Sequence, residues 1–350
     1  MQYNYLDFLS KVSNKVAPSG YEDDVVRIWK ECIFPYVDDV MVDVMGNVIA
    51  VKKGTSGKKL MLAAHADEVG LIITHVDSSG FLYFDGIGGI DVDILSGRSV
   101  IIKGMSRDVY GVIGVKPIHL KHRDAKTGEI SYEDLWIDIG ANSKDDALEK
   151  VSVGCVATIS SEMHVYNKRV SGKAMDNRCS LAVLIELARR LSDYKSKDDI
   201  YFVATAQEEL RARGAQSVAY NINPDACVVL DVAHATDYPS MSPIRDGDVK
   251  LGAGAVITLG PNFNRKIVQE LRTIAEGYKL KYQIEVASRP TGTDANPIQV
   301  TKTGIPTALV GIPCRYMHSP IEMIDCEDMD AVASLLEKFL ESFDISCLTN

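Results

Sequence analysis

The residues best suited to chemistry are two adjacent glutamates, Glu208 and Glu209, which follow an apolar run that begins at Tyr201. An uninterrupted run of β-branched and aromatic residues is typical of a buried parallel strand. Open α/β sheets bind their ligands beyond the carboxyl ends of such strands. One glutamate could therefore hold a metal ion while the other transfers a proton. A solvated acidic pair at a strand end is the alternative that this run alone leaves open.

Three more residues with metal-binding side chains follow predicted strands. They are His65 after the strand predicted over 60–64, Asp231 after 226–230, and His318 after 307–310. Asp176 lies at the predicted start of a helix. Because the carboxyl ends of parallel strands share one edge of a sheet, we expect all these side chains to converge there.

Two imidazoles and several carboxylates suit divalent ions such as zinc, cobalt and manganese. This number of candidate ligands favours two ions over one. Two ions about 3.5–4 Å apart make the water between them a nucleophile near neutral pH. A carboxylate that is not bound to metal must then take the proton of that water and return it to the leaving group. The pair Glu208 and Glu209 includes a glutamate free for that task.

Each candidate ligand also has an ordinary interpretation. His65 could be a surface histidine at a strand end, and Asp176 could be the N-cap that satisfies free amides of its helix. Asp231 could belong to a turn, and His318 to a loop. A metal site explains all four residues together, and for that reason we prefer it.

The composition is that of a folded, acidic protein. The 350 residues include 38 Lys and Arg against 48 Asp and Glu, and the net charge of −10 argues against a nucleic-acid or anionic-membrane partner. No apolar run reaches the roughly 20 residues that span a bilayer, and no signal peptide is recognisable. The seven cysteines form no Cys-x-x-Cys motif. We therefore expect no disulfide framework, no thiolate zinc site and a cytoplasmic location.

Strand and helix patterns alternate in the first and last parts of the chain, which predicts an α/β fold with a mostly parallel sheet flanked by helices. Helices are expected over 6–16, 21–34, 176–191, 211–220, 265–277, 294–300 and 327–343, and strands over 40–44, 48–51, 60–64, 200–205, 226–230, 254–258, 282–286 and 307–310. Short β patterns punctuated by glycine lie between them and indicate a small β-rich, barrel-like domain. We assign 1–68 and 168–350 to the catalytic domain and 69–167 to the inserted domain.

The motifs resemble those of the dinuclear metallo-aminopeptidases that form tetrahedral (TET) particles, a family with glutamyl, deblocking and FrvX-like members and some members described as endoglucanases. The similarity runs from the first predicted helix to the last and includes the inserted domain. The matching stretches are His65-Ala66-Asp67-Glu68-Val69-Gly70, Ala174-Met175-Asp176-Asn177-Arg178, Ala206-Gln207-Glu208-Glu209, Arg213-Gly214-Ala215, Asp231-Val232-Ala233-His234-Ala235-Thr236-Asp237, Thr291-Gly292-Thr293-Asp294-Ala295 and Arg315-Tyr316-Met317-His318-Ser319-Pro320.

This resemblance implies a role for each candidate residue. The implied metal ligands are His65 and Asp231 for one ion, Glu209 and His318 for the other, and Asp176 for both. Glu208 would be the general base, and Asp67 would hydrogen-bond to His65 and orient it. The chain would then be an aminopeptidase with two divalent ions per subunit, zinc or cobalt first and manganese as a further possibility. Its substrates would be peptides with a free N-terminus, and its inserted domain would join subunits into dimers and a dodecamer.

Two positions depart from the family pattern. Asn177 stands where the family has a second aspartate after the bridging ligand, and Leu210-Arg211 stands where it has Val-Gly. The asparagine adds no charge beside the bridging ligand. Arg211 or Arg213 could change the pKa of the base or the entrance of the pocket. Neither departure removes a proposed ligand.

Two other functions stay open at this stage. Glycoside hydrolysis needs two carboxyl groups about 5–9.5 Å apart on either side of a sugar bond. Adjacent Glu208 and Glu209, backed by histidines and aspartates, fit metal binding better. The other alternative is a binding or scaffold protein that has lost catalysis, and only Asn177 and Leu210-Arg211 support it.

A few more residues allow two interpretations each. Arg289 and Arg315 could favour an acidic N-terminal residue in the substrate, or they could be solvated or form structural ion pairs. His119 and His122 have no accompanying carboxylate or cysteine pattern, so we expect a loop there and not a second zinc site.

Overall fold

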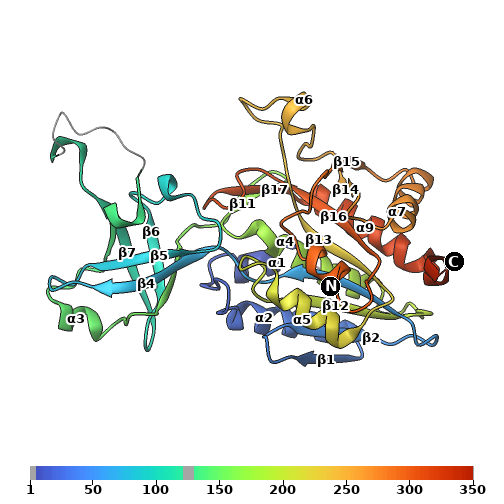
Figure 1. Cartoon of the computed structure of the whole chain (residues 1–350), viewed down its shortest axis with the longest axis horizontal. Helices are drawn as coiled ribbons and strands as arrows, with labels where there is room; N and C mark the ends of the chain where they lie inside the picture. Colours follow the sequence, from blue (N-terminus) through green and yellow to red (C-terminus); the bar gives the residue numbers. More distant parts are fainter. Residues whose placement is uncertain (1–4, 121–129, 350) are drawn as a thin grey trace.

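The computed structural model describes residues 5–120 and 130–349. Figure 1 shows a β-barrel at one end of the molecule and a larger structure of helices and a sheet at the other. This confirms the predicted fold class, an α/β fold with a mostly parallel sheet and an inserted barrel. Within the described residues, no helix is long and apolar enough to cross a membrane.

The main sheet has eight strands in the order β1-β2-β12-β3-β13-β16-β14-β15. They are β1 (Asp39–Val42), β2 (Val48–Lys52), β3 (Lys59–His65), β12 (Asp199–Thr205), β13 (Ala226–His234), β14 (Ala255–Leu259), β15 (Tyr282–Val286) and β16 (Thr307–Cys314). The four central strands, β12, β3, β13 and β16, are mutually parallel. Their residues are almost all buried, as expected for apolar runs covered on both faces.

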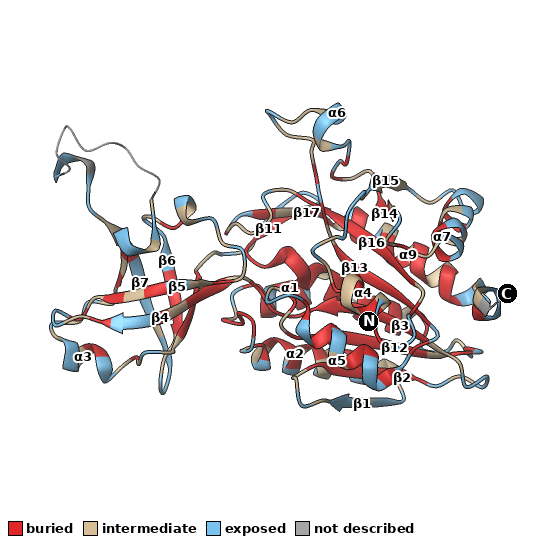
Figure 2. Cartoon of the chain, in the orientation of Figure 1, coloured by how far each residue is buried: buried red, intermediate tan, exposed pale blue. Residues whose placement is uncertain are grey.

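The helices pack against the main sheet and form the hydrophobic core with it. They are α1 (Tyr5–Val12), α2 (Asp23–Ile33), α4 (Met175–Arg190), α5 (Arg213–Ile222), α6 (Pro243–Asp246), α7 (Arg265–Gly277), α8 (Ala295–Gln299) and α9 (Cys326–Ser342), with α3 (Lys144–Leu148) in the inserted part. Helix α4 packs against the sheet and is itself contacted by α1, α2 and α9. Figure 2 shows it within the buried interior, which explains why its sequence is apolar on nearly every side.

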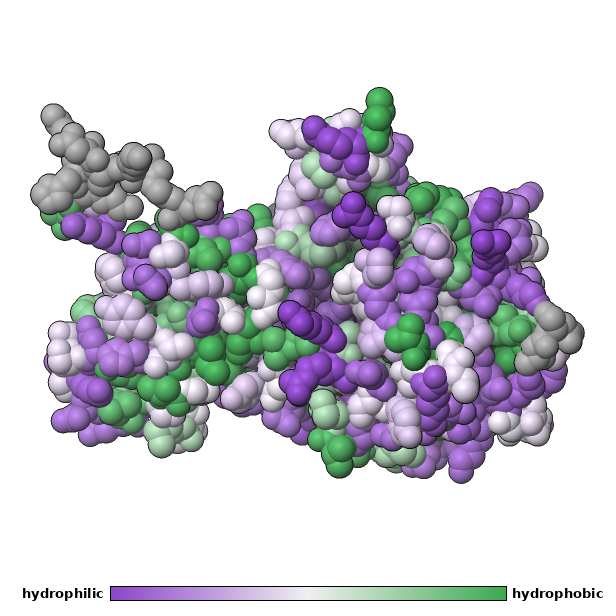
Figure 3. All heavy atoms as spheres, viewed as in Figure 1, coloured by the Kyte–Doolittle hydropathy of each residue, from purple (hydrophilic) through white to green (hydrophobic). Residues whose placement is uncertain are grey.

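The barrel closes in the order β4-β5-β8-β7-β6-β9. Its strands are β4 (Gly70–Val76), β5 (Leu82–Ile87), β6 (Ser99–Lys103), β7 (Asp108–Val115), β8 (Leu135–Asp138) and β9 (Val156–Ile159). Strand β8 is not evident from the sequence, because its short apolar run lies between the acidic residues Asp134 and Asp138. Figure 3 shows hydrophobic side chains on the visible face of the barrel, and Met105, Tyr110 and Val112 are more than half exposed. Such a surface is a candidate for contacts with other subunits.

A separate three-stranded sheet joins the barrel region to the edge of the main sheet where the candidate ligands lie. It consists of β10 (His164–Tyr166), β11 (Arg169–Gly172) and β17 (Glu322–Asp325) in that order. Strand β11 leads directly into α4, and β17 follows the loop that carries His318. These strands therefore fix the two segments that approach the edge of the main sheet. Strand β10 lies in the range assigned to the inserted domain, yet it pairs with β11.

The ends of β13 and β16 differ from expectation, and β16 continues past 310 to Cys314. We expected the strand that precedes Asp231 to end at 230, but β13 continues to His234. The reason is that β13 pairs with β16 from Cys227 through His234, so backbone hydrogen bonds keep this segment extended past the aspartate. Asp231 therefore projects from the body of a strand and does not belong to a turn.

Candidate metal centre

The predicted ligands meet at one edge of the main sheet. His65 is the last residue of β3, Glu208 and Glu209 follow β12, Asp231 lies in β13, and His318 follows β16. These four strands are neighbours, which brings their polar residues together as expected for parallel strands. Asp176 joins them from the first turn of α4.

Asp176 lies between the two histidines. Its Oδ1 is 3.0 Å from His65 Nε2, and its Oδ2 is 3.4 Å from His318 Nε2. Asp231 Oδ1 is 3.7 Å from the same His65 nitrogen, and Glu209 Oε1 is 3.3 Å from the same His318 nitrogen. Asp176 does not cap its helix, because the N-cap position is Ala174 and its backbone has positive φ. His65 is not a surface residue, because only 2% of it is exposed.

These residues form two groups that could each hold a divalent ion. In one, ligand atoms of His65, Asp176 and Asp231 lie within 4.8 Å of one another, and in the other, those of Asp176, Glu209 and His318 do. The two groups share Asp176, which offers a different oxygen to each histidine. Imidazole and carboxylate donors in this number fit a pair of zinc-like ions with a bridging carboxylate.

A third group of the same kind contains His65, Glu208 and Glu209. Proximity alone therefore allows either glutamate to be a ligand. The contact between Glu209 and His318 favours Glu209 for the second ion, since among the described residues Glu208 forms no ion pair with either histidine. This leaves Glu208, which is buried beside the cluster, free to handle a proton.

Backbone carbonyls orient both imidazole rings. His65 Nδ1 lies 3.2 Å from the carbonyl oxygen of Asp67, and His318 Nδ1 lies 2.8 Å from that of Gly89. A proton on Nδ1 makes each of these a hydrogen bond and leaves Nε2 free to bind metal. Because Gly89 belongs to the inserted segment, that segment helps to hold a candidate ligand.

The carboxylate of Asp67 does more than we expected from sequence. It lies 3.4 Å from His65 Nδ1, close to the predicted contact. It also accepts hydrogen bonds from the backbone amides of Glu208 and Glu209, each at 3.0 Å, and from the hydroxyl of Ser19 at 2.6 Å. Asp67 therefore fixes the turn that carries both glutamates as well as the ring of His65.

The charges of the cluster shift the pKa values of its members. Hydrogen bonds to Asp176 and Glu209 raise the pKa of His318 to about 11. Burial raises the pKa of Glu208 to about 10, with a further rise from Asp231 and Asp294 against the opposing effect of His65. Burial opposes ionisation of Asp176, yet hydrogen bonds from His318 and His65 lower its pKa. The raised pKa values of Glu208 and His318 favour their protonated forms, and metal ions bound at the cluster would displace such protons.

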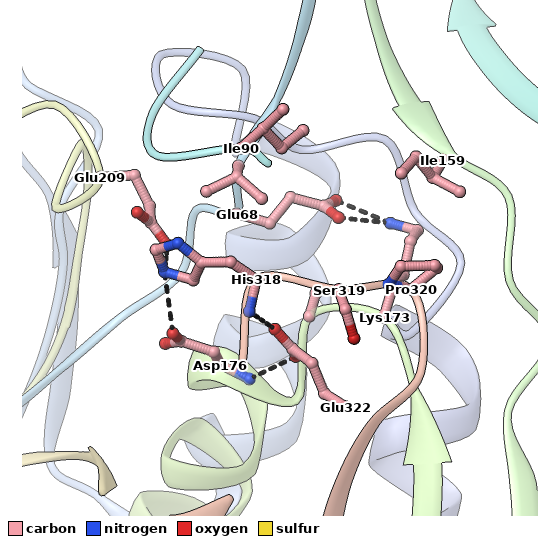
Figure 4. Close-up of a pocket in the computed structure, with 12 residues that line it drawn as sticks. Glu68, Ile90, Ile159, Lys173, Asp176, Glu209, His318, Ser319, Pro320 and Glu322 are labelled. Carbon is pink, nitrogen blue, oxygen red and sulfur yellow. Dashed lines mark hydrogen bonds and ion pairs between the residues drawn. The ribbon is translucent and has the colours of Figure 1, made fainter. Parts of the chain in front are cut away.

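Several buried carboxylates that support the centre were missed by sequence reasoning. Glu322, on β17, accepts hydrogen bonds from the backbone amides of Asp176 (3.0 Å) and His318 (2.8 Å), as Figure 4 shows. Asp294 accepts a hydrogen bond from Thr205, and burial raises its pKa to about 7. The stretch around Asp294 is among the motifs that match the family, but the sequence alone assigns Asp294 no role in the centre. No sequence motif marks Glu322, because one of its partners, Asp176, is distant in the chain and the other, His318, lies across a loop.

A buried ion-pair network lies on the barrel side of the centre. Glu68 binds Lys173 Nζ at 2.7 Å and Arg178 at 2.7 Å, and all three side chains are at most 5% exposed. Figure 4 shows the pair of Glu68 and Lys173 next to the loop of His318. The network ties the segment after β3 to the first residues of α4, and it thereby helps to hold His65 and Asp176 near one another.

The two departures from the family pattern leave the cluster intact. Asn177 is buried and donates a hydrogen bond to the carbonyl of Leu230, while its Oδ1 has no hydrogen-bond partner among the described residues. Arg211 and Arg213 are exposed, and neither is a cause of the shifted pKa of Glu208. The pKa of the candidate base is therefore set by burial and by the cluster, and not by these arginines.

The structure also shows the surroundings of the other basic residues for which the sequence left two interpretations. Arg315 forms a two-bond ion pair with Asp237 (2.7 and 2.6 Å), so it is a structural residue. Arg289 is exposed. His119 is exposed near a short turn, and His122 lies outside the described residues.

A cleft of about 350 Å³ opens beside the cluster. Its walls include all the candidate ligands together with Glu208. The volume falls within the usual range for a small-molecule or substrate site. A sheet edge with shared carboxylate and imidazole groups and an adjoining cleft defines a metal-dependent hydrolase as the class that the structure resembles.

Comparison with known proteins identifies the family. A family model described as M42 glutamyl aminopeptidase matches residues 46–335. The lysyl aminopeptidase of Pyrococcus furiosus is 36% identical over 346 residues, which cover 96% of each chain. The chain belongs to the M42 glutamyl aminopeptidase family, as its motifs predicted, and is thus an aminopeptidase by family.

Solved structures support the same assignment. A TET aminopeptidase from the marine sediment archaeon Thaumarchaeota archaeon SCGC AB-539-E09 has a TM-score of 0.94 and 30% identity, over 99% of this chain and 98% of that one. The TET1 peptidase of Pyrococcus horikoshii, which can assemble into a tetrahedron or a large octahedral shell, has a TM-score of 0.85 and 31% identity, over 97% and 100%. The predicted fold and family are both confirmed.

Proposed function

We propose that this protein is a dinuclear metallo-aminopeptidase that removes N-terminal residues from peptides. The observation that carries the proposal is the pair of ligand groups that share Asp176. His65 and Asp231 would complete one site, and Glu209 and His318 the other. When bound, two divalent ions, zinc or cobalt first and manganese as a further possibility, would polarise the scissile carbonyl and lower the pKa of the attacking water.

The protein's own residues would supply the proton transfers. Glu208 takes a proton from the attacking water as the new carbon–oxygen bond forms, and it returns that proton to the departing amine as the carbon–nitrogen bond breaks. Burial favours the protonated form that Glu208 must keep between these two steps. Asp67 and Glu322 hold the backbone of the reacting groups in place through hydrogen bonds.

The test is to strip the protein of metal, reconstitute it with zinc, cobalt or manganese, and assay a panel of aminoacyl-anilides. We expect hydrolysis only with metal. Glu208→Gln should bind metal as the wild type does and lose hydrolysis by about 10²- to 10⁴-fold. Comparable turnover in that variant would remove Glu208 from its role.

The same experiment separates the alternatives. Adjacent Glu208 and Glu209 both lie in one cluster with His65, which does not resemble two carboxyl groups on opposite sides of a sugar bond. Cellulose hydrolysis that survives complete metal removal would nevertheless establish a glycosidase. Fewer than one ion per chain at saturating zinc or cobalt would favour an inactive scaffold protein.

We further propose a cytoplasmic homo-oligomer in which residues 69–167 form the assembly domain. All seven cysteines are free, which suits a reducing compartment. The exposed hydrophobic residues of the barrel support subunit contacts. The related TET1 peptidase can assemble into a tetrahedron or a large octahedral shell and has been solved as a dodecamer, so a dodecamer built from dimers is the expected state.

A further inference from the structure

We propose that Glu285 selects substrates with a long, cationic N-terminal side chain, so that the enzyme prefers lysine and arginine at that position. This inference rests on the proposed function and adds the substrate class to it. Family resemblance does not decide the matter, because the family description names a glutamyl activity and a relative at 36% identity is a lysyl aminopeptidase.

Glu285 lines the same cleft as the candidate metal ligands. The remaining wall includes the apolar residues Val232, Ala233, Leu309 and Met317. Lysine and arginine side chains have an apolar stem that packs on such surfaces and a charged end that needs a polar partner. The cleft therefore offers both of the surfaces that a long cationic side chain requires.

Strand register directs Glu285 toward the metal centre's side of the sheet. Glu285 on β15 pairs with Thr258 on β14, and Asp231 on β13 pairs with Gly311 on β16. Gly311 in turn pairs with Val256 on β14, two residues before Thr258, so Glu285 and Asp231 share a face. Three strand spacings separate them, which corresponds to about 15 Å between their Cα atoms. A short substrate side chain held at the centre cannot span that distance.

Within the described residues, the carboxylate of Glu285 forms no ion pair with a lysine or an arginine. The carboxylate accepts a hydrogen bond from the hydroxyl of Thr258 at 3.3 Å. No lysine or arginine lines the cleft. Burial raises the pKa of Glu285, whereas the hydrogen bond from Thr258 and the nearby His234 oppose that rise. A half-buried carboxylate of this kind gains most from a cation that the substrate brings.

A second possibility is that Glu285 binds the free α-amine common to all substrates. That arrangement would make every substrate depend equally on Glu285. A selector of the side chain, in contrast, affects only substrates with a charged side chain. Comparison between substrates therefore distinguishes the two.

The experiment measures kcat/KM of the metal-loaded enzyme for lysyl-, arginyl-, leucyl- and glutamyl-anilides. In the wild type, we expect the lysyl and arginyl substrates to exceed the leucyl one. In Glu285→Gln, kcat/KM for lysine and arginine should fall about 10- to 100-fold, mainly through KM, while leucine changes less than about threefold. Glu133→Gln removes the same charge from an exposed position of the barrel and should change none of them.

Charge reversal gives an independent check. Glu285→Lys should lose lysyl activity and gain glutamyl activity. A fall that is equal for all four substrates, or a wild type that prefers leucine or glutamate, would overturn the inference. If no anilide is hydrolysed by the metal-loaded wild type, the aminopeptidase proposal itself fails, and if only lysine and arginine are refused, this inference fails alone.

Discussion

At the scale of single residues, the adjacent glutamates have different surroundings. Glu209 contacts His318. Glu208 is buried beside His65, and its burial raises its pKa. The sequence could place both at a strand end, because an apolar run followed by charge is a local pattern. It could not separate their roles, since the separation depends on His318, which is more than a hundred residues away.

The raised pKa of His318 predicts that metal binding releases protons. In the metal-free protein its pKa is about 11, so at pH 8 the ring carries a proton on Nε2 that a metal ion must displace. Metal affinity should therefore rise with pH up to this pKa.

Calorimetry at pH 8 in buffers of different ionisation enthalpy should show release of at least one proton per chain. Replacing His318 by Gln should reduce the release, and replacing the exposed His75 by Asn should not. Binding without any proton release would contradict this.

At the scale of elements, strand β17 controls the geometry of the centre through Glu322. Its two oxygens accept from the amides of Asp176 and His318, which come from different segments. In Glu322→Gln, one oxygen becomes an amide nitrogen that cannot accept, so one amide loses its partner. We expect the free energy of unfolding to fall by about 1–3 kcal/mol, and metal affinity to fall with it, measured by denaturant titration and by metal titration.

Asp328 provides the matched control for Glu322. It accepts from the amides of Gly252 and Gly254, each at 2.7 Å, and it is not among the candidate metal ligands. Asp328→Asn should therefore lower stability by a similar amount without changing metal affinity. Equal losses of metal affinity in both variants would mean that Glu322 acts only through general stability.

The elements also show what a sequence can predict. The buried strands β3, β12 and β16 are recognisable because each contains a run of apolar residues. The helix α7 and the strand β15 have the predicted bounds. The short strands β8, β10 and β17 are not recognisable, because their three or four residues include charged or exposed side chains and form no continuous apolar run. Their positions follow from partners that are distant in the chain.

At the scale of the whole molecule, the sheet, the barrel and the small third sheet all contribute to one centre. His65 comes from the main sheet, Gly89 from the inserted segment, and Glu322 from the third sheet. The metal ions would link these parts. A buried network of Glu68 with Lys173 and Arg178 also links the segment after β3 to the start of α4.

Metal removal should consequently destabilise the whole fold. A ligand at 100 times its Kd that binds only the folded state adds about 2.7 kcal/mol to the free energy of unfolding. We expect the melting temperature to fall on chelation and to recover on addition of zinc or cobalt, as followed by calorimetry. Glu208→Gln should show the same recovery, because Glu208 is not a proposed ligand. An unchanged melting temperature would contradict the structural role of the ions.

The central claim is that two ions share Asp176, with Glu209 and not Glu208 as a ligand. The most direct measurement is an anomalous difference map from crystals loaded with zinc, recorded on both sides of the zinc edge. We predict two peaks about 3.5–4 Å apart, both in contact with Asp176, with His65 and Asp231 at one and Glu209 and His318 at the other. A single peak, or a peak bound by Glu208 in place of Glu209, would contradict the account.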